Sequence, residues 1–291
     1  MTDPGVRADL ADRADQVIRT FYRAFALSVG GRVVERDGVV ACLGVHPSPI
    51  VTNTAWRSDP STDPATVLGV VEAIYAGAGF VGSLMTSSRS DADLEAAARQ
   101  AGRRVVVELP VMVVERASRP SPSPGPPAAT MPTAATAATA PPAATTPPAV
   151  TVRRIEPVAD LGVFRTILID GFFEGDDGGR SLIDATFASP SSLTGSGVGA
   201  FLAELDGQAV SVAGAWRLGD DAAIGWVATI PSARRRGLGA LVTARAVDFA
   251  FDHGAGLAVL QASPSGRPVY ERLGFATVGL DRIWEPPGAR G

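Results

Sequence analysis

The chain has 291 residues, of which 46% are apolar and 19% charged, so it is long enough for two domains with hydrophobic cores. A net charge of −4, a charged N-terminus without a signal-peptide core and the lack of a long apolar run predict a cytoplasmic protein that binds neither nucleic acid nor membrane. One cysteine and two histidines exclude an intrachain disulfide and argue against a metal site, so we expect no metal.

The first 116 residues are typical of a domain of their own. Apolar residues recur at helical spacing over 6–28, and the pair Asp37-Gly38, which favours a type I′ turn, predicts a hairpin over 32–44. Alternating strands and helices, beginning with a strand, are then expected at 45–56, 64–76, 80–85, 91–101 and 105–114.

Residues 117–149 differ sharply in composition from the rest of the chain. Proline, alanine, threonine and serine dominate, and no charged residue follows Arg119. Such a segment lacks the apolar side chains that would offset its ordering entropy. We therefore predict a disordered linker between a domain at 1–116 and a second domain at 150–291.

The second domain begins with a predicted strand at 150–155 and a helix that ends near residue 173. An acidic, glycine-rich loop and a short helix at 181–188 follow, and Asp206-Gly207 predicts a second hairpin over 201–216. The remaining expected elements are a strand ending at 230, a helix at 239–253, a strand at 257–262, a helix at 264–273 and a strand at 275–284.

The two halves share this order of elements at similar spacing, which predicts a tandem duplication. The first half lacks the basic glycine turn of the second, and its corresponding loop after Trp56 carries acidic residues instead. We expect this degenerate half to shape or cover the active site.

The stretch Arg234-Arg235-Arg236-Gly237-Leu238-Gly239 lies between an apolar strand and a helix start. The first N–H groups of a helix have no intrahelical partner, and the helix dipole adds positive charge there. Glycine allows the backbone to approach a phosphate closely. Since the chain has no lysine, the P-loop is excluded, and the turn predicts a site for a different diphosphate.

This Arg-x-x-Gly-x-Gly turn resembles the acyl-CoA signature of the GNAT superfamily of N-acetyltransferases. Tyr270-Glu271-Arg272-Leu273-Gly274-Phe275 resembles a second family motif, Tyr-x-x-x-Gly-Phe. The resemblance covers residues 150–291. It implies an α+β fold with a mixed, mostly antiparallel sheet flanked by helices, here in two similar domains, and acetyl-CoA as co-substrate.

The resemblance also implies positions for the co-substrate. The pantetheine arm would run along the edge of the strand that ends at 230, and the pyrophosphate would lie on the glycine turn. A serine stands where the family often uses asparagine to hold the pantetheine. The residues expected to bind acetyl-CoA are Val227, Ala228, Thr229, Arg234, Arg235, Arg236, Gly237, Leu238, Gly239, Ala240 and Ser263.

Tyr270 is the candidate general acid for the leaving thiolate, with structural packing as the alternative role. The general base stays open, because Ala223 and Gly225 stand where many family members place Glu or His. An amine that arrives neutral would need no base. An acidic loop lining the acceptor pocket would favour a cationic amine. The acidic candidates for the base are Asp170, Glu174, Asp176, Asp177 and Glu204.

The function expected from these residues is acetyl transfer from acetyl-CoA to the primary amine of a small molecule or peptide. Direct attack in a ternary complex is favoured, because no cysteine in residues 150–291 could carry the acetyl group. The alternatives are a non-catalytic acyl-CoA sensor or regulatory module, and a scaffold that binds a protein partner. The sequence leaves the acceptor and the oligomeric state open.

Overall fold

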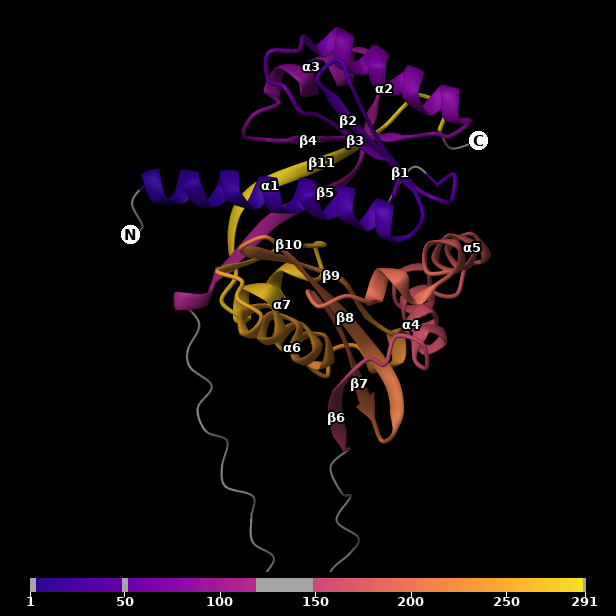
Figure 1. Cartoon of the computed structure of the whole chain (residues 1–291), viewed down its shortest axis with the longest axis vertical. Helices are drawn as coiled ribbons and strands as arrows, with labels where there is room; N and C mark the ends of the chain where they lie inside the picture. The colour runs from indigo at the N-terminus through magenta and orange to yellow at the C-terminus, as the bar shows by residue number, and fades with distance from the viewer. Residues whose placement is uncertain (1–3, 49–51, 119–148, 290–291) are drawn as a thin grey trace, which may run out of the picture.

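The structure is a computed structural model that describes residues 4–48, 52–118 and 149–289, so the predicted linker lies almost wholly outside the described residues. The strands found in these ranges form one sheet in the order β1-β2-β3-β4-β11-β5-β10-β9-β8-β7-β6 (Figure 1). The described helices include none that is both long and apolar enough to cross a membrane. In the same ranges, no His, Cys, Asp and Glu side chains gather as a potential metal site.

The strands are β1 (Arg32–Arg36), β2 (Val39–Leu43), β3 (Thr54–Arg57), β4 (Ser83–Ser87), β5 (Arg104–Glu115), β6 (Val150–Arg154), β7 (Val198–Leu205), β8 (Gln208–Leu218), β9 (Asp221–Thr229), β10 (Leu257–Gln261) and β11 (Ala276–Glu285). The α-helices are α1 (Pro4–Ser28), α2 (Pro64–Ala78), α3 (Ala92–Gln100), α4 (Leu161–Phe173), α5 (Asp177–Thr186), α6 (Leu238–Asp252) and α7 (Arg267–Arg272). Short 3₁₀ turns lie at Arg116–Ser118, Pro190–Leu193 and Pro231–Ala233.

The two halves of the chain exchange their last strands. β5 and β11 pair with each other in antiparallel fashion at the centre of the sheet (Figure 1). β5, from the first half, continues onto β10 of the second half, and β11, from the second half, continues onto β4 of the first. Each half therefore receives a central strand from the other, an arrangement that the sequence did not indicate. The domain boundaries at 116 and 150 stay a prediction.

Both predicted Asp-Gly hairpins are present. Asp37 and Gly38 have φ values of 48° and 75°, and Asp206 and Gly207 have 52° and 79°. Positive φ at both central residues is the requirement of a type I′ turn, whose twist matches that of the flanking strands. The turns join β1 to β2 and β7 to β8.

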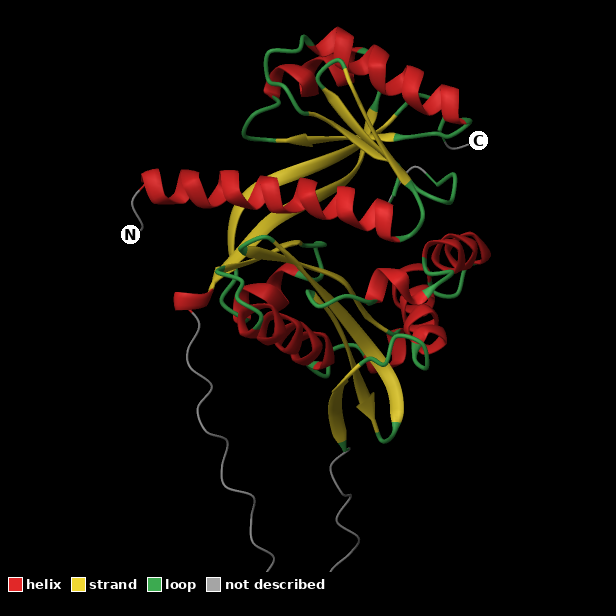
Figure 2. Cartoon of the chain, viewed as in Figure 1, coloured by secondary structure: helices red, strands yellow, loops and turns green. Residues whose placement is uncertain are grey.

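The helices cover the sheet on both faces (Figure 2). In the second half, α6 packs through Val242 and Ala246 on one face, and α4 packs through Phe164 and Leu168 in a separate core cluster. Helix α1 crosses the middle of the molecule and contacts strands of both halves. The Arg13 guanidinium on α1 donates to the Asp221 carboxylate at the start of β9, with N···O distances of 2.9 and 2.6 Å.

Several predicted elements differ from the structure in extent, and the short helix expected at 181–188 begins earlier, at Asp177 in the acidic loop. Of the strand expected at 45–56, the described residues form only β3, which begins at Thr54, and Pro47 provides no backbone N–H for a ladder. The first helix of the second half begins at Leu161 and not at Pro157. The Asp160 carboxylate accepts from the Glu156 N–H at 2.8 Å, which holds the intervening residues in a turn.

Candidate active site

The candidate site lies where β9 and β10 separate. Their parallel pairing runs from Leu257↔Asp221 to Val259↔Ala223, and β9 then continues to Thr229 beyond its last described pair with β10. A bulge lies in this continuation, since the register with β8 shifts and Trp226 has a φ of 54°. Val227, Ala228 and Thr229, the residues expected to contact pantetheine, lie on this diverging part of the strand.

Helix α4 packs closely against this part of β9. A Cβ built on Gly171 would lie 2.9 Å from the Ala228 Cβ, so the contact requires glycine. The Arg234 guanidinium donates to the carbonyls of Gly171 at 2.8 Å and Thr229 at 3.3 Å, and it lies 3.9 Å from the Glu174 carboxylate. Arg234 thus connects the turn after β9 to the end of α4, and phosphate binding by its side chain stays a prediction.

The N-terminus of α6 has features that would suit an anion. Gly237 precedes the helix with a φ of 79°, and no side chain in the described chain caps this end. The first helical residues, Leu238, Gly239 and Ala240, therefore present their N–H groups toward the turn. Arg235 and Arg236 are exposed beside them. Uncapped N–H groups, the helix dipole and two guanidinium groups together suit a pyrophosphate.

Tyr270 and Ser263 lie in and just before α7. Tyr270 is buried, its ring lies 6.0 Å from that of Phe275, and burial raises the pKa of its hydroxyl to about 12. A phenol with a raised pKa stays protonated at neutral pH and remains a hydrogen-bond donor. The exposed Ser263 hydroxyl accepts from the Gly266 N–H at 3.1 Å and therefore caps the turn before α7.

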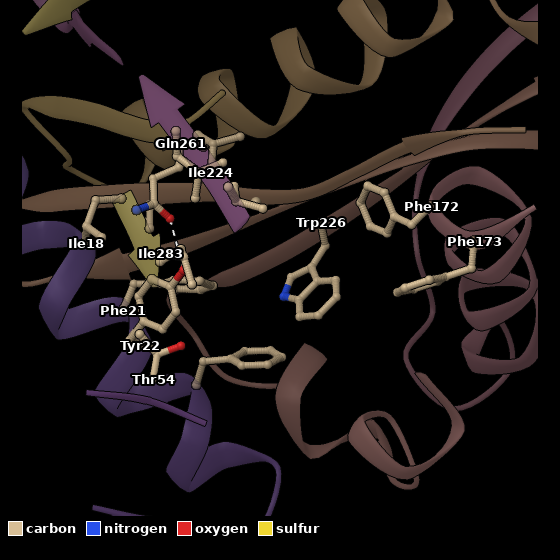
Figure 3. A pocket seen from close by; sticks show the side chains of 15 residues that line it. Ile18, Phe21, Tyr22, Thr54, Phe172, Phe173, Ile224, Trp226, Gln261 and Ile283 are labelled. Atoms are coloured by element: carbon tan, nitrogen blue, oxygen red, sulfur yellow. Dashed lines mark hydrogen bonds between the residues drawn. The ribbon is translucent and has the colours of Figure 1, made fainter. Parts of the chain in front are cut away.

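A cavity of about 370 Å³ opens beside the separated strands (Figure 3). Both halves of the chain contribute to it, as expected if the first half covers the site. The fifteen lining residues are Ile18, Phe21, Tyr22, Phe25, Thr54, Val107, Leu109, Phe172, Phe173, Ala223, Ile224, Gly225, Trp226, Gln261 and Ile283.

No carboxylate is among these lining residues. Ala223 and Gly225 line the cavity and offer no side chain that could act as a base. The acidic loop does not line it: Asp176 caps α5 by accepting from Gly179, and Glu174 approaches Arg234 instead. The other candidates, Asp170, Asp177 and Glu204, are also outside the lining.

Aromatic residues were the part of the site that sequence reasoning missed. Trp226, which belongs to the apolar strand before the glycine turn, lines the cavity, with ring centroids 5.2 Å from Phe25 and 4.9 Å from Phe187. Phe21, Tyr22 and Phe25 all come from α1. Their aromatic cluster within about one helix turn was the available signal.

A chain of hydrogen bonds lies at one end of the cavity. The Tyr22 hydroxyl donates to Gln261 Oε1 at 3.1 Å, and Gln261 Nε2 donates to the Asp281 carboxylate at 2.7 Å (Figure 3 draws the first bond). Burial raises the pKa of Tyr22 and, with the nearby Asp15 carboxylate, raises the pKa of Asp281 to about 7. Gln261 is thereby held between a protonated phenol and a buried carboxyl group.

Comparison with known proteins gives a family for part of the chain. Residues 168–275 match the family model described as the acetyltransferase (GNAT) family. This range contains β9, the glycine turn, α6 and Tyr270. No curated protein matches the chain.

Solved structures extend the fold to nearly the whole chain. A GCN5-related N-acetyltransferase from Kribbella flavida is 22% identical with a TM-score of 0.67, covering 94% of this chain and 95% of that protein. A conserved protein of unknown function from Staphylococcus epidermidis is 13% identical with a TM-score of 0.59, over 89% and 95% of the two chains. A GCN5-related N-acetyltransferase from Sphaerobacter thermophilus is 15% identical with a TM-score of 0.54, over 85% and 76%. At these identities, the likeness establishes the α+β fold.

Proposed function

Because residues 168–275 belong to the GNAT acetyltransferase family, we propose that this protein transfers an acetyl group from acetyl-CoA to a primary amine by direct attack in a ternary complex. The observation that carries the proposal is the uncapped N-terminus of α6, which follows the separating strand β9 after the turn at residues 230–237. Pyrophosphate on α6 would position the pantetheine arm along Val227, Ala228 and Thr229.

In the proposed step, the amine nitrogen attacks the carbonyl carbon of the thioester. A C–N bond forms, the C–S bond breaks, and CoA leaves as a thiolate. The proton lost from nitrogen balances the proton gained by sulfur, so the products are an amide and free CoA. Tyr270 would donate to the developing thiolate, for which its protonated hydroxyl is suited.

Calorimetry and thiol release test this proposal on the full chain. Acetyl-CoA should bind with a stoichiometry of one, and free thiol should appear only when an amine acceptor is added. Tyr270→Phe should lower kcat by about 10²-fold and leave the Kd of acetyl-CoA unchanged. An unchanged kcat would restrict Tyr270 to packing, and absence of acetyl-CoA binding would contradict the proposed function.

The second candidate function is a non-catalytic acyl-CoA sensor. The observation that favours it is the lack of a carboxylate among the residues that line the cavity. The same thiol-release assay separates the two candidates, because a sensor binds acetyl-CoA but shows no turnover with any amine.

A further inference from the structure

We infer that the acceptor is an aromatic monoamine, whose ring lies among the aromatic side chains of the cavity and whose amino group donates to Gln261 Oε1. This inference rests on the proposed function, and it names the substrate class of that same site. It follows from the shape of the lining, from its charge and from the orientation of one amide.

The cavity has an aromatic end and a polar end. Figure 3 shows Phe172 and Phe173 at one end, Trp226 between, and Tyr22 and Gln261 at the other. The ring centroids of Phe172 and Trp226 are 6.4 Å apart, a separation typical of aromatic neighbours. Such a lining suits a ligand with one flat apolar body and one polar group.

The polar end fits an uncharged amine. Besides the Trp226 indole N–H, the polar side chains among the fifteen lining residues are those of Tyr22, Thr54 and Gln261, and none of the fifteen carries a negative charge. An ammonium group would lose its hydration there without a counter-ion, so burial favours the neutral amine that attack requires. A second amino group on the acceptor would meet the same unfavourable surroundings, which argues against polyamines.

Gln261 is oriented to accept from that amine. Its Nε2 donates to Asp281, whose side chain is buried, and this bond directs Oε1 toward Tyr22 and the cavity. The carbonyl oxygen accepts one bond from Tyr22 and has a second lone pair for the amine N–H. Gln261 lies at the end of β10, on the strand that faces the separated part of β9. Tyr22 and Asp281 act as positioning residues.

The experiment compares acceptors on the full chain at saturating acetyl-CoA, with thiol release as the readout. Phenethylamine should be acetylated with a kcat/KM about 100-fold above that for spermidine, the scale on which apolar pockets discriminate. Phe172→Ala should lower kcat/KM for phenethylamine by about 10-fold because it removes part of the aromatic end. Val163 is also half-exposed on α4 but lies outside the cavity, so Val163→Ala is the matched control and should leave kcat/KM for phenethylamine unchanged.

Gln261→Leu tests the amine contact. It should lower kcat/KM for phenethylamine by about 10-fold and leave the KM for acetyl-CoA unchanged. Tyr22→Phe should give a smaller loss of about three-fold, again without changing the KM for acetyl-CoA. If both residues had only a structural role, the KM for acetyl-CoA and the melting temperature would change together with the amine parameters.

Four outcomes would overturn the inference. Preference for spermidine would show that the cavity accepts a polycation. Preference for octanoyl-CoA over acetyl-CoA, without acetylation of phenethylamine, would show that the cavity holds an acyl chain. Binding of acetyl-CoA with no turnover of any aromatic amine would overturn the substrate class alone, whereas absence of acetyl-CoA binding would overturn the proposed function as well.

Discussion

Helices α2 and α6 occupy equivalent places in the two halves, yet their N-termini differ. Each helix follows one strand of a parallel pair and leads to the other, β3-α2-β4 in the first half and β9-α6-β10 in the second. At α2, the Asp63 carboxylate accepts from the N–H groups of Ala65 and Thr66, both at 3.1 Å. At α6, Gly237 occupies the same position and supplies no cap.

The arginines beside these helices differ in the same way. Arg57, at the end of β3, is buried and donates to Asp91 and Asp93 at distances of 2.8–3.1 Å. Arg235 and Arg236, before α6, are exposed. In the first half, aspartate side chains accept from the helix N-terminus and from the arginine. In the second half, the helix N-terminus and the exposed arginines are available to an external anion. If the two halves arose by duplication, as the sequence predicts, carboxylates in the first half take the places that a phosphate would occupy in the second.

Arg57→Met is expected to have the largest effect on stability. It should lower the free energy of unfolding by about 3–5 kcal/mol, because Asp91, with a side chain 4% exposed, would remain buried without its cation. Urea unfolding measures the change. The matched variant Arg236→Met, at an exposed arginine, should change the free energy by no more than about 0.5 kcal/mol. Equal decreases in the free energy of unfolding for the two variants would contradict the difference between the buried and the exposed arginine.

Gly237→Asp copies the residue found before α2 into the site before α6. The carboxylate should weaken acetyl-CoA binding by about 100-fold, since it places a negative charge against the pyrophosphate. Gly237→Asn, which tolerates the left-handed backbone equally well, is the neutral control and should weaken binding by less than about 10-fold. Calorimetric titration decides, and similar affinities for the two variants would place the pyrophosphate elsewhere.

Asp63→Ala removes the cap of α2. The melting temperature should fall by about 2–4 °C, because two N–H groups lose their acceptor. The stoichiometry of acetyl-CoA binding should stay at one, since Arg57 remains engaged by Asp91 and Asp93. A second bound acetyl-CoA would show that Asp63 alone closes an otherwise functional site.

Arg236→Gln should have the smallest effect. An exposed guanidinium attracts phosphate weakly in water, so the Kd of acetyl-CoA is expected to rise by about three-fold. The difference from the wild type should disappear at high salt, where such charges are screened. A loss that persists at high salt would indicate that Arg236 is buried by the bound ligand.

Local features of the chain could be predicted from the sequence. The two Asp-Gly turns and the strand-turn-helix around Gly237 each lie within one short stretch, so propensity and glycine placement suffice to identify them. The family motif around Tyr270 is equally local. These signals identified the fold class, and the residues that they indicate for acetyl-CoA stay a prediction.

Features that depend on which distant segments of the chain come together could not be predicted. β5 and β11 are typical strands in sequence, and nothing within either indicates that it pairs with the other half. The cavity likewise combines residues of α1, β3, β5, α4, β9, β10 and β11, which are far apart along the chain. Trp226 lies in an apolar strand, and its place at the cavity depends on a bulge and on Phe25 from α1, which the sequence does not indicate.

Because the two halves exchange strands, a cut in the backbone between Ser118 and Ala149 should leave two polypeptides that depend on each other. Two polypeptides would result, but each would still hold a strand that the other needs, β5 against β10 and β11 against β4. Either fragment alone would present an unpaired edge prone to aggregation. Produced together, the fragments should reassemble as a heterodimer, which makes this protein suited to complementation by its own two pieces.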